Sequence, residues 1–183
     1  MISIFLAPGF EEIEALAVAD VLRRAELEVR LVGVGGPWIT GAHGIKVECD
    51  LADEQADPQD KTLEMIVLPG GMPGALNLEK SAVVQAFIDL ALQNGLWIGA
   101  ICAAPSILGH RDILQGKTAT CFPGFEQELR GARCTGGFVE QDGRIITAKG
   151  PGVAMDFALR LVEVLAGRER AQKVRDSLQC RPQ

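Results

Sequence analysis

Nearly continuous apolar runs alternate with amphipathic stretches along the whole chain. The runs lie at 2–7, 28–34, 64–71 and 96–101, and each contains few polar residues. A strand with one face in solvent would instead alternate apolar and polar positions. Strands that are apolar on both faces are typical of a parallel sheet covered by helices. The pattern therefore predicts an α/β fold with a doubly wound, mostly parallel sheet.

Helical patterns lie between these strands. Apolar residues recur at helical spacing over 11–25, 81–95 and 152–167. The segment 138–148 has strand-like residues on both sides of Asp142–Gly143, a dipeptide that favours tight hairpin turns. We therefore expect helices on both faces of the sheet and a β-hairpin in the C-terminal half of the chain.

The chain has the size and composition of a single domain spanning residues 1–183. It is 183 residues long, 48% of its residues are hydrophobic, and its formal net charge is −6. Only the polar segment 49–61 is predicted to form a long surface loop. A negative chain has no electrostatic basis for binding nucleic acid or an anionic membrane. The uncharged stretch 96–110 is also shorter than the roughly 20 residues of a membrane span.

The cysteines and glycines indicate neither a metal nor a cofactor. The chain has five cysteines and no C-x-x-C pair, which argues against a disulfide framework and against a zinc site. The glycines within 33–37 lack the spacing of a dinucleotide-binding fingerprint, and no P-loop is present. No secretory signal precedes the first strand. We therefore expect a cytoplasmic protein that needs no cofactor or metal.

Cys102 lies where the fourth strand passes into a helix. Its neighbours two positions away are Ala100 and Ala104, and Pro105 suits the first turn of a helix. Small residues at these positions are typical of a nucleophile elbow, a sharp strand-to-helix turn that exposes a reactive side chain. Backbone amides at a helix start favour a thiolate and would lower the pKa of this cysteine. A buried, unreactive cysteine is the alternative, and the local sequence does not decide between the two.

Glu14 is the acidic residue that the helical pattern turns inward. Ala17, Val18 and Val21 share its face of the helix, so the carboxyl group is expected to be buried. Burial would raise its pKa, and the protonated carboxyl could then donate a hydrogen bond to the Cys102 sulfur. A carboxylate that binds a backbone amide is an equally good alternative.

Other residues at the strand ends have ordinary explanations as well as functional ones. Gly70 and Gly71 end the third strand, where backbone without side chains can approach a ligand and direct its amides at an oxyanion. A plain tight turn is the alternative. Glu11 and Glu12 need no role beyond complementing the helix dipole. Because ligands bind at the carboxyl ends of parallel strands, these ends and Cys102 are expected to meet in one cleft.

Taken together, the motifs resemble those of the ThiJ/PfpI superfamily. The resemblance covers residues 2–171, and the most similar branch is that of the parkinsonism-associated protein deglycase and its bacterial relatives. It implies a flavodoxin-like fold and a homodimer. The matching motifs occur in the family's order and are PGFEEIEA (8–15), IVLPGGMPGA (66–75), GAICAAP (99–105), VEQDGRIITAKGPG (139–152) and DFAL (156–159).

The resemblance also implies a set of site residues. Cys102 matches the family's nucleophile and Glu14 its buried, protonated glutamate. Gly70, Gly71 and Ala103 match positions whose amides contact the substrate or the oxidised cysteine. The implied activities are glutathione-independent conversion of methylglyoxal to lactate and hydrolysis of early glyoxal adducts on proteins or nucleotides. Both would protect a cell under oxidative stress and need no cofactor or metal.

Two positions depart from the family pattern. Where some members have a pocket histidine, this chain has Cys121 or Phe122, so a Cys–His peptidase would lack its base. Where the human-like branch has a pocket arginine, this chain offers His43. His43 is either an ordinary surface residue or an auxiliary acid–base or substrate contact, and Cys121 is the other auxiliary candidate. His110 is expected only to interact with a helix C-terminus.

The leading hypothesis is a cysteine-dependent, cofactor-free glyoxalase or deglycase. The alternative from another class is a redox sensor or chaperone, in which oxidation of Cys102 to a sulfinate changes partner binding. An intracellular cysteine peptidase is disfavoured by the missing histidine. A glutamine amidotransferase is disfavoured because no His–Glu pair follows the elbow.

Overall fold

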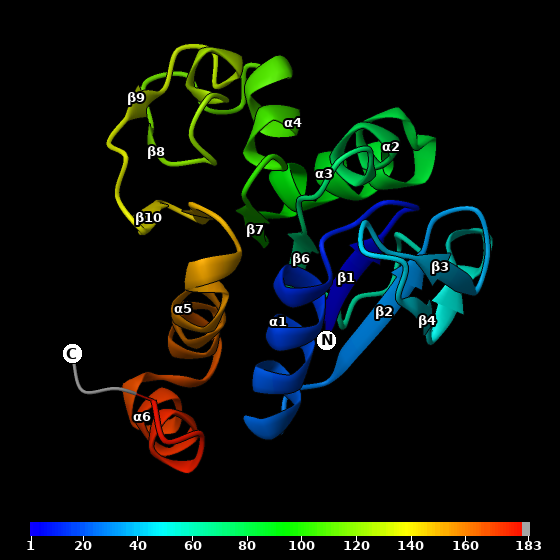
Figure 1. Cartoon of the computed structure of the whole chain (residues 1–183), viewed down its shortest axis with the longest axis vertical. Helices are drawn as coiled ribbons and strands as arrows, with labels where there is room; N and C mark the ends of the chain where they lie inside the picture. Colours follow the sequence, from blue (N-terminus) through cyan, green and yellow to red (C-terminus); the bar gives the residue numbers. More distant parts are fainter. Residues whose placement is uncertain (181–183) are drawn as a thin grey trace.

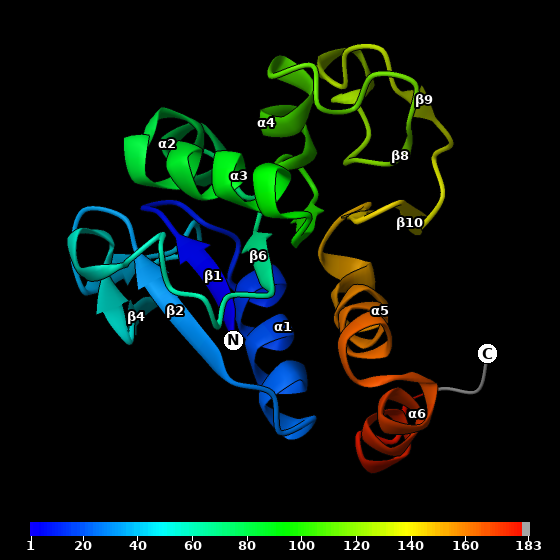
Figure 2. The same cartoon turned by 180° about the vertical axis from the view of Figure 1, so that it is seen from behind.

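One central sheet lies between two layers of helices in the computed structural model, which describes residues 1–180 (Figure 1 and Figure 2). Its seven strands have the order β10-β11-β7-β6-β1-β2-β5, and only the β10–β11 pairing is antiparallel. From β2 to β11 this is the flavodoxin-like order, so the predicted fold class is confirmed. The strands are β1 (Ile2–Leu6), β2 (Val29–Gly33), β5 (Leu51–Ala52), β6 (Met65–Leu68), β7 (Trp97–Ile101), β10 (Val139–Asp142) and β11 (Ile145–Ala148).

Each face of the sheet has its own helices and its own hydrophobic core. Side chains alternate along a strand, so Ile4 of β1 packs in one core and Phe5 in the other. No helix within residues 1–180 is long and apolar enough to cross a membrane. One face carries α1 (Glu12–Arg24), α5 (Ala154–Ala166) and α6 (Arg168–Ser177), and the other carries α2 (Gly74–Lys80), α3 (Ala82–Asn94) and α4 (Pro105–His110).

The three long predicted helices correspond to α1, α3 and α5. The Ser81 hydroxyl caps α3 by accepting the Val84 amide at 3.3 Å, and Gly95 ends the helix in the left-handed conformation. The predicted hairpin is also present as the antiparallel pair β10 and β11. The strong periodic patterns were therefore reliable guides to the elements.

Two predicted boundaries differ from the structure. The third strand was expected over 64–71, but β6 ends at Leu68, so Gly70 and Gly71 lie in the following loop. The segment 49–61 was expected to be only a loop, yet it contributes the edge strand β5. β5 pairs through two residues, which is too short to produce a hydrophobic period.

Several short elements have no recognisable sequence pattern. A small hairpin of β3 (Trp38–Thr40) and β4 (Lys46–Glu48) follows β2. β8 (Thr118–Ala119) and β9 (Arg133–Cys134) form a second small sheet. Within the described residues, three single-turn 3₁₀ helices complete the elements, at Asp53–Gln55, Glu126–Glu128 and Pro151–Val153.

The order of the strands brings the functional segments together. β6 lies between β1 and β7, so the loops that follow these three strands meet at one edge of the sheet. A side chain at Gly9 would collide with Pro73, which shows how closely the loops after β1 and β6 pack. The Ala42 amide donates to the Phe10 carbonyl at 2.8 Å and holds the β3–β4 turn against the start of α1.

Candidate active site

Cys102 lies on a strained turn between β7 and α4. Its φ is +64°, a conformation that non-glycine residues seldom adopt. Its amide donates to the Ala148 carbonyl at 2.8 Å, and its own carbonyl accepts the Phe122 amide at 2.9 Å. Neighbouring segments therefore hold the turn from both sides. This is the geometry of the predicted nucleophile elbow.

Gly70 is the point at which the loop after β6 meets both Glu14 and Cys102. Its amide donates to Glu14 Oε2 at 2.8 Å. A methyl group at this position would lie 2.7 Å from Cys102 Cβ and 2.8 Å from Glu14 Oε2. Only glycine lets the backbone come this close to the acid and the thiol.

Glu14 is fully buried, as its helical position predicts. Its Oε1 has no hydrogen-bond partner among residues 1–180. Burial raises the pKa of Glu14 to about 7, and the charge of Glu11 adds to this effect, whereas the Cys102 thiol and the Gly70 amide act to lower the pKa. The carboxyl thus binds a backbone amide and also interacts with the thiol. A group that titrates near neutral pH can give or take a proton there.

The pKa of Cys102 differs from the prediction for an elbow thiol. Burial, together with the Glu14 carboxylate, raises the pKa of Cys102 to about 12. The amides of Gly71 and Ala103 lower it, as predicted, but they are outweighed. The physical reason is that a thiolate next to an ionised carboxylate in a buried site is unfavourable. A protonated Glu14 would remove the neighbouring charge and make ionisation of the sulfur less unfavourable.

The loop after β6 rests on the start of α1. Gly71 has φ +87°, and a Cβ there would lie 2.4 Å from the Glu11 amide nitrogen. The same Glu11 amide donates to the Gly70 carbonyl at 3.0 Å. The Gly71 amide faces the Cys102 sulfur, whereas the Gly70 amide is already bound to Glu14. We expected the Gly70 amide to face a substrate, but in the structure this amide donates to Glu14.

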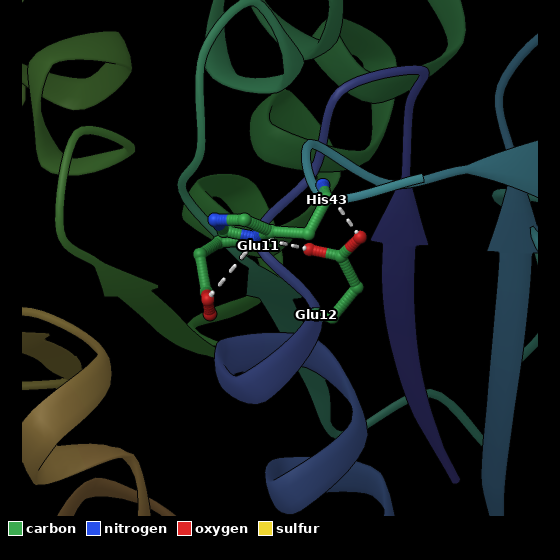
Figure 3. Close-up of side chains that lie close together, drawn as sticks. All are labelled: Glu11, Glu12 and His43. Carbon is green, nitrogen blue, oxygen red and sulfur yellow. Dashed lines mark hydrogen bonds and ion pairs between the residues drawn. The ribbon is translucent and has the colours of Figure 1, made fainter. Parts of the chain in front are cut away.

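His43 lies beside the start of α1 and contacts Glu12 (Figure 3). Its Nδ1 is 2.8 Å from Glu12 Oε2, and its amide donates to Glu12 Oε1, also at 2.8 Å. Glu11 Oε1 is 4.0 Å from the same Nδ1. The hydrogen bond and charge of Glu12 raise the pKa of His43. The sequence reasoning missed this cluster because Glu12 and His43 are far apart in the chain.

Cys121 and Cys102 belong to different hydrophobic cores. Cys121 packs in the core on the α3 face, whereas Cys102 belongs to the core on the α1 face. Burial raises the pKa of Cys121 to about 12, with smaller contributions from nearby Glu126 and Cys134. The pKa of Cys102 is raised to the same value, so the two thiols differ in the core that they join and in the contact of Cys102 with Glu14, not in pKa.

His110 is the last residue of α4, as expected, but it also bridges two carboxylates. Its Nδ1 is 2.5 Å from Glu79 Oε1, and its Nε2 is 2.8 Å from Glu128 Oε2. Hydrogen bonds that the imidazole donates to Glu128 and Glu79 raise the pKa of His110.

An open, mainly apolar hollow of about 580 Å³ lies between the loop at 122–123 and the segment 149–153. Phe122 and Phe138 line it, and both are exposed, by 43% and 68%. Phe122 also holds the Cys102 carbonyl through its amide. The sequence gives no signal for this hollow, because its two exposed phenylalanines belong to separate loops.

The fold and the site define a class of protein: a flavodoxin-like α/β domain with a cysteine on a nucleophile elbow and a buried glutamate beside it. Comparison with known families gives a definite match. The model of the DJ-1/PfpI family matches residues 1–164. The chain therefore belongs to the DJ-1/PfpI family, which confirms the resemblance found in its motifs.

Curated relatives are DJ-1 proteins. Protein dj-1beta of Drosophila melanogaster is 36% identical over 178 residues, which cover 96% of this chain and 94% of the fly protein. The crystal structure of Drosophila melanogaster DJ-1beta superposes with a TM-score of 0.92 at 34% identity, covering 99% of this chain and 98% of that one. The fold therefore extends over the whole length of these relatives.

One further relative is much longer than this chain, and another is named for an enzymatic activity. Protein DJ-1 homolog B of Arabidopsis thaliana is 37% identical over 97% of this chain, which spans only 41% of the plant protein. Glutathione-independent glyoxalase DJR-1.2 of Caenorhabditis elegans is 34% identical over 90% of this chain and 87% of the worm protein. The family thus includes a named glyoxalase.

Proposed function

We propose that this protein is a cysteine-dependent, cofactor-free glyoxalase that converts a small α-oxoaldehyde such as methylglyoxal to a hydroxy acid. Early glyoxal adducts of proteins or nucleotides are a second substrate class. The observation that carries the proposal is the Glu14–Cys102 pair on the elbow, with the Gly71 and Ala103 amides directed at the sulfur. The worm relative named as a glyoxalase supports it.

The first step joins the sulfur to the aldehyde carbon. As the Cys102 sulfur attacks, its proton passes to the Glu14 carboxylate and the C=O π electrons move to the oxygen. Glu14 then gives that proton to the oxygen, which forms a hemithioacetal and leaves Glu14 ionised for the next step. The Gly71 and Ala103 amides are placed to stabilise negative charge at this point. Because Glu14 takes the proton as the sulfur attacks, no free thiolate is needed, and the high pKa of Cys102 does not prevent the attack.

The second step moves hydrogen between adjacent carbons. Glu14 takes the proton from the former aldehyde carbon, an enediol forms, and a proton returns to the neighbouring carbon. The product is a thioester of the 2-hydroxy acid on Cys102. Water then cleaves the C–S bond, releases the hydroxy acid and restores the thiol. One water is consumed, and the reaction needs no external oxidant or reductant.

The test follows methylglyoxal by proton NMR with purified protein and no glutathione. We expect lactate from the wild-type protein and none from Cys102→Ala. A Ser106→Ala variant, which removes a hydroxyl bonded to a backbone carbonyl in α4, is the matched control for a small change near the elbow. Equal lactate formation by Cys102→Ala would contradict the proposal.

A redox sensor or chaperone is the second candidate function. The Gly71 and Ala103 amides and a protonated Glu14 could equally hold the oxygens of a Cys102 sulfinate. One structural relative, at 34% identity and a TM-score of 0.89, is Toxoplasma gondii DJ-1 in an oxidised form. Peroxide treatment followed by mass spectrometry tests this candidate. Two oxygen atoms gained at Cys102, with no lactate formed by the reduced protein, would favour it over the enzyme.

We also propose a homodimer that works in the cytoplasm. Ile13 and Ile45 are large apolar side chains that are 56% and 53% exposed, and the backbone of Ile45 contacts Glu12 at the start of α1. Two such residues on one side of the molecule favour a contact with a second copy. The five free cysteines favour a reducing compartment. Light scattering of Ile13→Lys would show a monomer if this surface forms the dimer.

A further inference from the structure

Glu11, Glu12 and His43 form a cluster at the start of α1, outside the thiol chemistry described above. Glu11 is the N-cap residue of α1, Glu12 is the first residue of that helix, and His43 comes from the turn between β3 and β4. Their side chains converge in Figure 3. One ligand atom from each residue lies within 4.8 Å of the other two. Because the segments are far apart in the chain, this convergence is a product of the fold.

Both carboxylates are already positioned by backbone amides. Glu11 Oε2 accepts the Glu14 amide, and Glu12 Oε1 accepts the His43 amide, each at 2.8 Å. One oxygen of each group therefore remains on the side of the imidazole. Glu12 Oε2 lies 2.8 Å and Glu11 Oε1 lies 4.0 Å from His43 Nδ1. Preorganisation of this kind is what supporting hydrogen bonds supply in metal sites.

The charges of the cluster are not balanced. Glu11 and Glu12 are only 9% and 5% exposed. Within residues 1–180, neither carboxylate has an ion pair with lysine or arginine, and His43 is their one cationic neighbour. Glu11 Oε1 makes no hydrogen bond to any described residue. Two nearly buried carboxylates beside one imidazole leave an excess negative charge, which a dication would neutralise.

We propose that Glu11, Glu12 and His43 form a binding site for a zinc ion. An imidazole nitrogen with two carboxylate oxygens is a donor set that suits zinc better than magnesium or calcium, which prefer oxygen ligands alone. Tetrahedral zinc bonds of about 2.1 Å place ligand atoms about 3.4 Å apart. The distances of 2.8 and 4.0 Å bracket this value. The fourth position would hold water.

The zinc site would act on the position of α1 and not on the thiol directly. It would join the first turn of α1 to the β3–β4 turn, two segments now linked through Glu12 and the Ala42–Phe10 hydrogen bond. The proposal stands apart from the glyoxalase reaction, because none of its three ligands acts on the substrate in that mechanism. Its success or failure is therefore measured by metal binding alone.

The experiment titrates the metal-stripped full-length protein with zinc chloride in a calorimeter. All proteins carry Cys102→Ala, so that binding at the elbow thiol does not contribute. We expect one zinc per chain, and at least ~10-fold weaker binding after His43→Ala, the loss typical of a disturbed metal site. His43 has a side chain that is 69% exposed, so its truncation is compatible with folding.

The matched control is His110→Ala, since the chain contains only two histidines. It should bind zinc like its parent, and magnesium chloride should give no binding to any variant. The two imidazoles also allow a direct check by NMR, in which zinc should shift the His43 nitrogen signals and leave those of His110 unchanged. Equal zinc affinity with and without His43, or an absence of zinc binding by the parent, would overturn the proposal.

Discussion

Glu12 and Glu14 lie two residues apart on one turn of α1 and are both buried, yet their pKa values are shifted in opposite directions. Burial acts to raise the pKa of Glu12, but hydrogen bonds from the His43 side chain and amide bring it below its usual value. Burial raises the pKa of Glu14 to about 7, and the charge of Glu11 adds to this effect, although the Cys102 thiol and the Gly70 amide act to lower the pKa. Positions i and i+2 point to opposite sides of a helix. The surroundings, and not the residue type, decide which carboxyl exchanges protons.

The largest expected effect is the loss of turnover when the Glu14 carboxyl is replaced. Glu14→Gln removes the group that takes the thiol proton, so we expect turnover of methylglyoxal to fall by about 10²–10⁴-fold. Reaction of Cys102 with a thiol probe should persist in this variant. The control is Asp20→Asn, an acid-to-amide change at an exposed position of the same helix. Undiminished turnover by Glu14→Gln would show that the raised pKa has no catalytic consequence.

The second prediction concerns stability against pH. Glu14 binds a proton more tightly in the folded protein, with a pKa of about 7, than in the unfolded chain, near 4.5. Stability should therefore fall as pH rises from about 4.5 to 7 and then level off, with a total cost of about 3 kcal/mol. Glu14→Gln should lack this loss and unfold at higher urea concentration than wild type at pH 8. Parallel pH profiles of the two proteins would contradict the assignment.

The third prediction concerns a substitution next to Glu14 that displaces its carboxyl group but leaves the residue itself unchanged. In Gly70→Ala the added methyl collides with Cys102 Cβ and Glu14 Oε2. We expect a loss of about 1–3 kcal/mol in stability and a fall in turnover. Gly152→Ala is the matched control, because a Cβ at Gly152 meets no atom within 4 Å. A melting temperature of Gly70→Ala equal to that of Gly152→Ala would show that the loop can move aside.

The smallest expected effect belongs to the pair of Glu12 and His43. Glu12 has a lowered pKa, so its contribution is present above about 4.5 and is lost as pH falls through the folded value. His43 has a raised pKa, so its contribution is complete below 6.5 and is lost as pH rises through the folded value. In metal-free protein, His43→Ala should lower the melting temperature slightly, and most clearly between about pH 4.5 and 6.5. A difference that does not depend on pH would exclude this ion pair as the cause.

Local patterns in the sequence determined the main framework. The apolar runs located the long central strands, the helical period placed Glu14 on the inward face of α1, and small residues around Cys102 identified the elbow. Ser81 and Gly95 marked the ends of α3. These features depend on the period of the backbone and on residues close in the chain, which a sequence displays directly.

Only the tertiary structure decided how those residues behave. It bound the Gly70 amide to Glu14, made the Cys102 pKa depend on Glu14, and brought His43 to Glu12. It also added β5 and the β3–β4 hairpin, which are too short to leave a periodic pattern. Burial, charge and hydrogen-bond partners arise from contacts between distant segments. A pKa is the sum of these contacts, and so it belongs to the fold and not to the motif.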